Sequence, residues 1–285
     1  MFLIGWKKHG WLLYGFTKEK PKKIFIEREI NVIFMSLYYT FTKGVAEKRF
    51  VGFENFVDLA GNTAFQLSVR NSLAFIAVGV PVIVVISLAF SIMMSDRLYR
   101  FPRWAMLSPI IVPVASALMG WSVVFGNRGL VNSILNLLGM DAVEFFGIKY
   151  ARAVMIFIFI IKNTGYMSVI FTGALSSISR EYKEAFFLDS KSEIKYACKI
   201  VIPLIAPIIF FVVILCTVNS FQMFREVYAM YGNAPPLNVY LLQNFMNNNF
   251  FKLNYQRLST AAFIVIMCIS IVVASFLKFQ KKHSA

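Results

Sequence analysis

The chain has 285 residues, of which 58% are hydrophobic and 30 are phenylalanine. This composition excludes an ordinary soluble protein, whose core cannot hide so much apolar surface, and indicates a chain that lives in a bilayer. The formal net charge of +15 does not indicate nucleic-acid binding, because no basic and aromatic recognition module accompanies it. In a membrane protein, basic residues instead gather at the cytoplasmic ends of loops.

The N-terminal segment 1–29 is basic, with four lysines between positions 18 and 23. We expect it on the cytoplasmic side. The only candidate for a first span is about 24–42, which contains Glu27, Arg28 and Glu29. Each such charge costs roughly 2.5–3.5 kcal/mol at the centre of a membrane helix and much less near its end. We therefore predict a short, tilted or incompletely inserted first helix, or a truncated one, with its charges near the cytoplasmic face.

Five further stretches are apolar over the roughly 18–20 residues that a helix needs to cross about 30 Å of hydrocarbon. A helix is expected because a single segment in lipid must satisfy its own backbone hydrogen bonds. The five stretches are about 72–94, 104–125, 151–175, 203–224 and 259–277. The predicted fold is an all-α polytopic membrane protein with five clear spans plus an atypical first span, and residues 30–280 form one transmembrane domain.

Basic residues set the predicted orientation. If the charged loop at 176–202 is cytoplasmic, then so are residues 95–103, the segment 1–29 and the tail after Lys278. These segments carry 18 of the 29 lysines and arginines. By the positive-inside rule, this asymmetry favours a cytoplasmic C-terminus, including the tail 281–285.

Residues 181–203, EYKEAFFLDSKSEIKYACKIVIP, form a charged amphipathic segment of about two short helices between two apolar runs. Five residues match the pattern E-A-A, two residues, D-G-A, then I-x-L-P, with 19 residues from first to last: Glu184, Ala185, Asp189, Ile200 and Pro203. On these residues, the segment resembles the cytoplasmic EAA loop of bacterial ABC importer permeases. Phe186, Ser190 and Lys191 depart from the pattern. Serine tolerates a tight turn between helices less well than glycine, at a cost of about 1 kcal/mol.

Two further elements resemble the carbohydrate-uptake subtype of that family. Phe50–Phe56, FVGFENF, matches F-x-G-x-x-N-F/Y. Ser220 and the sequence FQMFREVYAMYGNAPP after it resemble S-F-x-x-F-D-x-I/V-Y-x-x-T-G-G-G-P, with Arg225 near the usual aspartate. The resemblance runs from about Asn31 to the C-terminus. It implies a type I ABC importer permease fold whose partners are ABC ATPase subunits, a second homologous permease and an extracytoplasmic substrate-binding protein.

The resemblance also implies a role for the loop at 176–203, which would couple the permease to the ATPase. Glu184 would present a carboxylate near the start of the loop helix, and the apolar face would fill a groove of the ATPase. The alternative is an ordinary cytoplasmic loop with solvated charges. The candidate coupling residues are Glu184, Ala185, Phe186, Leu188, Asp189, Ser190 and Pro203, and the apolar face is assigned to Ala185, Phe186 and Leu188.

Polar residues interrupt two of the clear spans. Lys162 and Asn163 lie near the middle of the third, where an ionisable group usually faces a polar cavity or a partner. Tyr166 follows four residues after Lys162 on the same helical face, and Asn219 and Gln222 interrupt the next span. These five residues are candidates for a translocation path. A structural pair or an inter-subunit hydrogen bond is the alternative for Lys162, and a helix cap at the membrane surface is the alternative for the other span.

The connection 232–257, rich in asparagine and aromatic residues, is expected outside the cell membrane. It is either a docking surface for a substrate-binding protein or an interfacial aromatic belt, and the aromatic count does not decide between them.

No constellation for covalent or metal chemistry is found in the sequence. His9 and His283 stand at opposite termini, and the phosphate-loop, GxSxG and HExxH motifs are missing. Cys198, Cys216 and Cys268 are too far apart to suggest a disulfide framework or a zinc site. We expect no cofactor and no metal, and we expect ATP hydrolysis to occur in a separate subunit.

The predicted function is that of a permease subunit of an ATP-driven ABC importer in the bacterial cell membrane, which translocates a sugar or oligosaccharide delivered by the binding protein. An ion-driven secondary transporter is the first alternative, but it predicts acidic residues within spans, and the clear spans contain no Asp or Glu. A membrane enzyme is disfavoured because no catalytic cluster is present. A degenerate or scaffold protein without transport activity is a further alternative, which gains some weight from the altered first span and Ser190.

Overall fold

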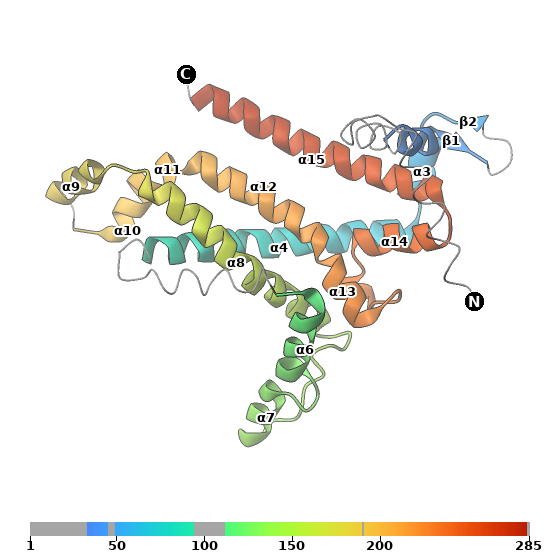
Figure 1. Ribbon diagram of the computed structural model, residues 1–285, viewed down its shortest axis with the longest axis horizontal. Helices are drawn as coiled ribbons and strands as arrows, with labels where there is room; N and C mark the ends of the chain where they lie inside the picture. The colour runs from blue at the N-terminus through green and yellow to red at the C-terminus, as the bar shows by residue number, and fades with distance from the viewer. Residues whose placement is uncertain (1–32, 45–48, 94–111, 190, 284–285) are drawn as a thin grey trace, which may run out of the picture.

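A computed structural model of the protein describes residues 33–44, 49–93, 112–189 and 191–283 (Figure 1). The elements in chain order are a helical segment over 33–41, β1 (Thr42–Lys43), β2 (Arg49–Phe50), α3 (Glu54–Ala60), α4 (Thr63–Met93), α6 (Val114–Phe125), α7 (Leu130–Leu137), α8 (Ala151–Ser176), α9 (Arg180–Asp189), α10 (Glu193–Tyr196), a π-helical turn (Ala197–Val201), α11 (Ile202–Leu204), α12 (Ala206–Gln222), α13 (Phe224–Tyr231), a 3-10 turn (Leu237–Val239), α14 (Leu242–Phe251) and α15 (Tyr255–His283). The two short strands pair as an antiparallel ribbon.

Within the described residues, four helices are long and apolar enough to cross a membrane. They are Thr63–Met93, Ala151–Ser176, Ala206–Tyr231 and Tyr255–Lys278. They agree with four of the five clear spans expected from the sequence, and the all-α polytopic fold is confirmed. The expected span at 104–125 lies partly outside the described residues, as does the atypical first span at 24–42, so the count of six spans stays a prediction.

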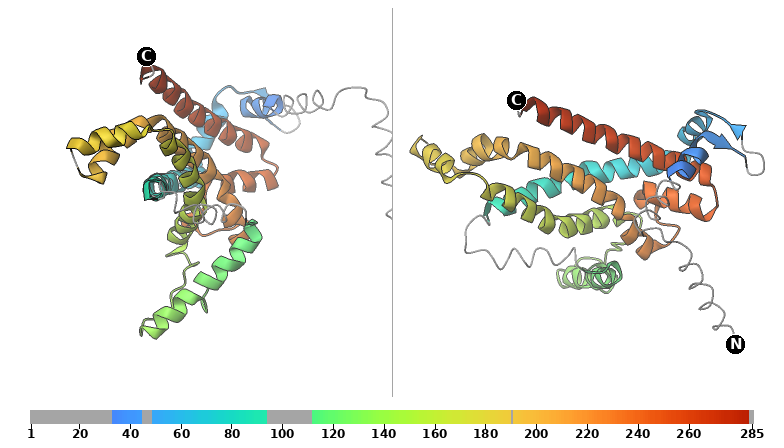
Figure 2. Two further views of the ribbon diagram at one scale, coloured as in Figure 1. Left: turned by 60° about the vertical axis from the view of Figure 1, so that its left-hand side comes forward. Right: turned by 45° about the horizontal axis from the view of Figure 1, so that its top comes forward.

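The long helices run side by side along the long axis of the molecule (Figures 1 and 2). The hairpin formed by α9 and α10 stands at one end of them. At the opposite end lie α3, the β1–β2 ribbon and α14 (Figure 1). Helices α6 and α7 project from the body as a separate arm (Figures 1 and 2). The two ends of the bundle therefore present different structures, a charged hairpin at one and a group of short elements at the other.

The centre of the fold is the packing of α4 against α8. The rings of Phe75 and Phe159 lie 5.0 Å apart between their centroids, and both side chains are buried. Gly79 faces the same ring, and a Cβ at this position would come within 2.9 Å of Phe159 Cδ1. Further along, Ser87 Oγ donates a hydrogen bond of 3.1 Å to the carbonyl oxygen of Thr164. Membrane helices associate through such close approaches and hydrogen bonds, because lipid is as apolar as their side chains.

The FVGFENF element, Phe50–Phe56, has a structural role at the end of the molecule opposite the hairpin. Gly52 has a φ of 54°, a left-handed conformation that favours glycine. Asn55 is buried, and its Nδ2 donates to the carbonyl oxygens of Thr40 (2.9 Å) and Thr42 (3.0 Å). The amide of Asn55 thus satisfies backbone acceptors where the helical segment before β1 ends.

Asn55→Ala is expected to lower the free energy of unfolding by about 1–3 kcal/mol, because it leaves two buried carbonyl oxygens without their donor. Thermal unfolding of the purified protein in detergent measures this loss. The control is Asn136→Ala, the same change at an exposed position of α7, which should alter the stability by no more than about 0.5 kcal/mol. Equal losses in the two variants would contradict the capping role of Asn55.

Candidate functional site

A row of polar side chains joins α8 to the end of α12. Asn219 Nδ2 donates a 3.0 Å hydrogen bond to Asn163 Oδ1, and Asn163 Nδ2 in turn donates to the carbonyl oxygen of Phe159 at 2.9 Å. Gln222 extends the row with a longer contact of 3.5 Å from its Nε2 to Asn219 Oδ1, and its side chain is exposed. The row therefore runs from a buried amide on α8 to an exposed amide at the end of α12. Three predicted path residues form it.

Lys162, the fourth predicted residue, makes an ion pair that was not predicted from the sequence. Its ammonium donates to Oε1 of Glu226, in the first turn of α13. The side chain of Glu226 is only 3% exposed, whereas that of Lys162 is 27% exposed. The carboxylate of the pair is therefore buried, whereas the lysine side chain is partly exposed. Lys162 and Asn163 are consecutive residues of α8, so the ion pair and the amide row join the same level of this helix to the α12–α13 segment.

Glu226 was missed because the expected span ended at residue 224, two residues before it. In the structure the apolar helix continues past a break at Met223, so the membrane-length segment is Ala206–Tyr231 and includes Glu226. This membrane-length helix therefore contains an acidic residue, unlike the span expected at 203–224. The available signal was the presence of Glu226 beside Arg225 in the resembling element, where an aspartate is usual.

Tyr166, the fifth predicted residue, lies on α8 one turn beyond Lys162. Its ring is half-buried and packs against the apolar core between α4, α8 and α12. The hydrogen bonds of the amide row join Asn163, Asn219 and Gln222, and Tyr166 is not part of them.

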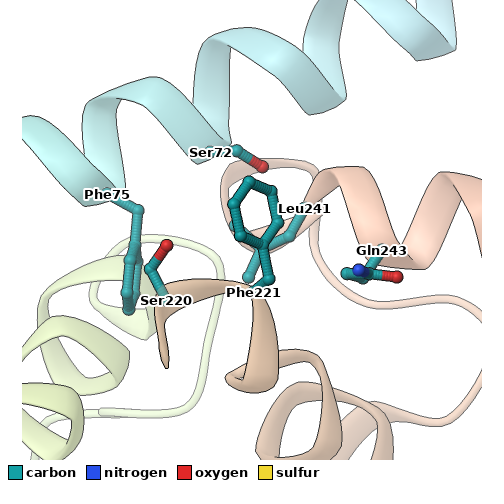
Figure 3. A pocket seen from close by; sticks show the side chains of 6 residues that line it. All are labelled: Ser72, Phe75, Ser220, Phe221, Leu241 and Gln243. Carbon is teal, nitrogen blue, oxygen red and sulfur yellow. The ribbon is translucent and has the colours of Figure 1, made fainter. Parts of the chain in front are cut away.

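A small pocket lies where α4, α12 and α14 meet (Figure 3). It is lined by Ser72, Phe75, Ser220, Phe221, Leu241 and Gln243, and its volume is about 230 Å³ including its open mouth. Ser72 Oγ accepts a 2.9 Å hydrogen bond from the backbone N–H of Leu242, so this hydroxyl already has a partner. Ligand pockets usually measure about 300–1,000 Å³. In the described part of the chain, this site is therefore a narrow gap between helices rather than a cavity large enough for a sugar.

At the end of the bundle away from the hairpin, Arg152 fastens the connection that follows α13. Its Nε donates to the carbonyl oxygen of Asn238 (2.8 Å), and its Nη2 donates to Asn71 Oδ1 (2.7 Å). Asn71 Nδ2 also donates to the carbonyl oxygen of Leu237 at 2.6 Å. These bonds hold the 3-10 turn of the 232–257 connection against α4 and α8. These hydrogen bonds were not predicted from the sequence, because the residues that they join are 81 to 166 positions apart.

The charged loop forms a helical hairpin with an aromatic interior. The ring of Tyr196 in α10 lies 5.6 Å from that of Phe186 and 5.8 Å from that of Phe187, both in α9. Ser192 caps α10, because its Oγ accepts a 3.3 Å hydrogen bond from the backbone N–H of Lys195. The two short helices therefore hold each other through three rings, and they stand off the end of the long helices (Figures 1 and 2).

The outer face of α9 carries charge and apolar surface together. Glu181, Glu184, Ala185 and Leu188 follow the spacing i, i+3, i+4, i+7, which places them on one face of the helix. All four are exposed, and Leu188 is 87% exposed. Phe186 does not share this face with Ala185 and Leu188, as the sequence analysis had assigned it, because its ring turns toward Tyr196.

The other candidate coupling residues flank this face. Asp189 is exposed at the end of α9, and Pro203 is exposed in α11. Ser190 lies outside the described residues.

These features define a class of protein. Long apolar helices carry a row of polar side chains and a partly buried ion pair near their middle. A charged hairpin, whose exposed face combines charged and apolar residues, lies at one end of these helices. This is the arrangement of a polytopic membrane transport protein.

The comparison with known proteins identifies the family. The family model described as "Binding-protein-dependent transport system inner membrane component" matches residues 68–283. The chain belongs to this family, and it is therefore a multi-pass inner-membrane permease component of a binding-protein-dependent transport system. Permease subunits are not enzymes. The resemblance inferred from the loop and the two flanking elements is confirmed, and the ion-driven secondary transporter is a class to which the chain does not belong.

Individual relatives agree with this assignment. The chain is 25% identical, over 83% of both chains, to the trehalose/maltose transport system permease protein MalF of Thermococcus litoralis. It is 26% identical to the lactose transport system permease protein LacF of Rhizobium radiobacter, over 81% of this chain and 80% of that one. Among solved structures, a chain of a bacterial ABC transporter involved in the import of the acidic polysaccharide alginate matches with a TM-score of 0.78 at 18% identity over 96% of both chains. The permease fold is confirmed by this likeness.

Proposed function

We propose that this chain is the permease subunit through which an ABC importer moves a sugar or oligosaccharide across the bacterial cell membrane. The observation that carries the proposal is the polar row of Asn163, Asn219 and Gln222 beside the Lys162–Glu226 pair, on helices that are otherwise apolar. Amide and charged groups in a membrane interior mark a substrate path by default. Two relatives named for trehalose/maltose and lactose transport support a sugar as the cargo.

The partners follow from the same proposal. ABC ATPase subunits dock on the α9–α10 hairpin from the cytoplasm, a second homologous permease completes the path, and an extracytoplasmic binding protein delivers the cargo. The exposed face of Glu184, Ala185 and Leu188 supports the ATPase contact, because it offers a carboxylate and apolar surface that the rest of the described chain leaves uncovered. Closure of the ATPase pair around ATP moves the hairpin, and rocking of the bundles opens the path to each side in turn.

The orientation and the domains belong to the proposal too. The hairpin end and the C-terminal tail 281–285 face the cytoplasm, the 232–257 connection faces outward, and residues 30–280 act as one transmembrane domain. The basic segment 1–29 is cytoplasmic. This arrangement agrees with the charge asymmetry of the sequence, because the hairpin loop and the residues after Lys278 are both basic.

Affinity purification of the tagged chain in mild detergent, with mass spectrometry of the proteins that come with it, tests the assembly. We expect an ABC ATPase and a second permease. The purified complex, reconstituted with its binding protein, should then take up trehalose, maltose or lactose only when ATP is inside with the ATPase subunits, and not with an ATPase variant that cannot hydrolyse ATP. An assembled complex that hydrolyses ATP but accumulates none of a broad panel of sugars would overturn the sugar assignment. A chain recovered alone from intact membranes would instead favour the degenerate or scaffold alternative.

A further inference from the structure

The Lys162–Glu226 pair has an uneven environment. Glu226 is almost fully buried, and its second carboxylate oxygen, Oε2, has no hydrogen-bond partner among the described residues. Lys162, by contrast, keeps about a quarter of its side chain exposed. Of the two side chains, only that of Lys162 is therefore partly open to its surroundings.

The open side of Lys162 is unsuited to lipid. Lys162 lies near the middle of the 26-residue helix α8, far from either end where a lysine can reach the membrane surface. A charged group at this depth faces a water-filled path or the interior of an assembly, because exposure to hydrocarbon is costly. At the same level of α8, Asn163 and Asn219 begin a row of amides that ends at exposed Gln222. Under the proposed function, the exposed part of Lys162 belongs to the wall of the path.

The charge of that wall depends on Glu226. With the ion pair intact the two charges cancel, and no other acidic side chain contacts Lys162 in the described residues. Without the carboxylate, an uncompensated ammonium would stand between apolar helices, where it would attract an anion more strongly than it does in bulk water. The fold alone does not determine whether the path wall carries a net charge. A chain of a transporter that imports the acidic polysaccharide alginate has the same fold, and other relatives are named for neutral sugars.

We propose that Glu226 is a specificity-determining residue that acts through Lys162. By holding and neutralising the lysine, it keeps the path wall electrically neutral, so that the permease passes uncharged sugars and does not retain anionic ones. Glu226 is a positioning residue: its buried carboxylate orients the ammonium as a hydrogen-bond donor toward a sugar hydroxyl and cancels its charge. This inference rests on the proposed function, because it presumes that the path carries sugar.

The test uses the reconstituted complex and the neutral sugar found to be taken up by the wild type. Uptake is measured with increasing glucuronate on both sides of the membrane, against sodium chloride of equal ionic strength. Glu226→Gln should become inhibited at a glucuronate concentration roughly tenfold or more below that which affects the wild type, because an uncompensated Lys162 binds the carboxylate. The matched control is the double variant Lys162→Gln, Glu226→Gln, which has no net charge and should regain the insensitivity of the wild type.

The other outcomes are decisive as well. Equal glucuronate sensitivity of the wild type, Glu226→Gln and the double variant would overturn the inference while leaving the sugar permease intact. If Glu226→Gln fails to assemble, whether or not the double variant assembles, the carboxylate serves folding and the specificity role is overturned. A wild-type complex that takes up no sugar at all contradicts the proposed function instead, which separates the two failures.

Discussion

Glu184→Lys is expected to abolish most sugar uptake while the chain remains in the membrane. Glu184 lies on the exposed face of α9 with Ala185 and Leu188, and the ion pair of this hairpin among the described residues joins Lys183 to Glu193 and leaves Glu184 out. In the proposed complex the carboxylate of Glu184 meets the ATPase. Reversal of a charge at the centre of an interface costs about 2–5 kcal/mol, which weakens docking roughly 30-fold or more. ATP-driven uptake by the reconstituted complex and recovery of the ATPase with the tagged permease measure the effect.

The matched control for this prediction is Glu193→Lys, which makes the same change of charge in the same hairpin. Glu193 is exposed on α10, and its carboxylate pairs with Lys183 at 3.5 Å. An exposed pair of this kind contributes about 0–1 kcal/mol, so uptake should stay within about fivefold of the wild type. If both variants lose uptake equally, the hairpin responds to its overall charge rather than to a docked Glu184. Unchanged uptake and ATPase recovery in Glu184→Lys would count against the coupling role.

Phe159→Ala is expected to cause the largest loss of stability in the transmembrane core. The ring is fully buried between Phe75 and Gly79, where α4 and α8 meet. In lipid the transfer part of the usual cost is small, because hydrocarbon is as apolar as the core. The cavity left by the ring remains, and its lost packing costs about 2–3 kcal/mol. Thermal unfolding of the complex in detergent measures this loss. Phe211→Ala, on α12 and 45% exposed, is the control and should change the stability by no more than about 0.5 kcal/mol.

A second variant tests whether this contact is a fitted pair. Gly79→Ala alone should cost about 1–3 kcal/mol, because its Cβ would come within 2.9 Å of Phe159 Cδ1, and this ring is fully buried and packs on Phe75. Combined with Phe159→Leu, the same alanine should cost less than it does alone, since the smaller side chain leaves room for the methyl group. Strictly additive losses in this pair would contradict direct contact between the two positions.

Features that depend on local sequence were predicted well. The span expected at 151–175 is α8, Ala151–Ser176. Its length is visible in the sequence because a membrane helix must be about 20 apolar residues long and must satisfy its own hydrogen bonds. The family was also identified from local sequence. The EAA-like spacing from Glu184 to Pro203 and the FVGFENF element are short patterns, and the family match over residues 68–283 confirms the assignment.

Boundaries were less secure where a helix changes direction. The expected span 203–224 stops near the break at Met223, whereas the apolar helix resumes in α13 and extends to Tyr231. In the sequence, the polar residues around this break have the pattern expected at the end of a helix. The tertiary structure continues the helix because α13 packs on α6 and the Lys162–Glu226 pair compensates the charge of its first turn.

The sequence by itself determined the class of this protein, the approximate positions of its long helices, the charged loop, and four of the polar residues that lie near one another in the structure. Only the tertiary structure decided the partners: Lys162 with Glu226, 64 residues apart, and Asn163 with Asn219, 56 residues apart. The physical reason is that these spans are apolar on every side, so no amphipathic stripe in the sequence tells which face of a helix meets its neighbour. In such helices the choice of face is made by packing and by the pairing of the few polar groups, and both require the assembled bundle.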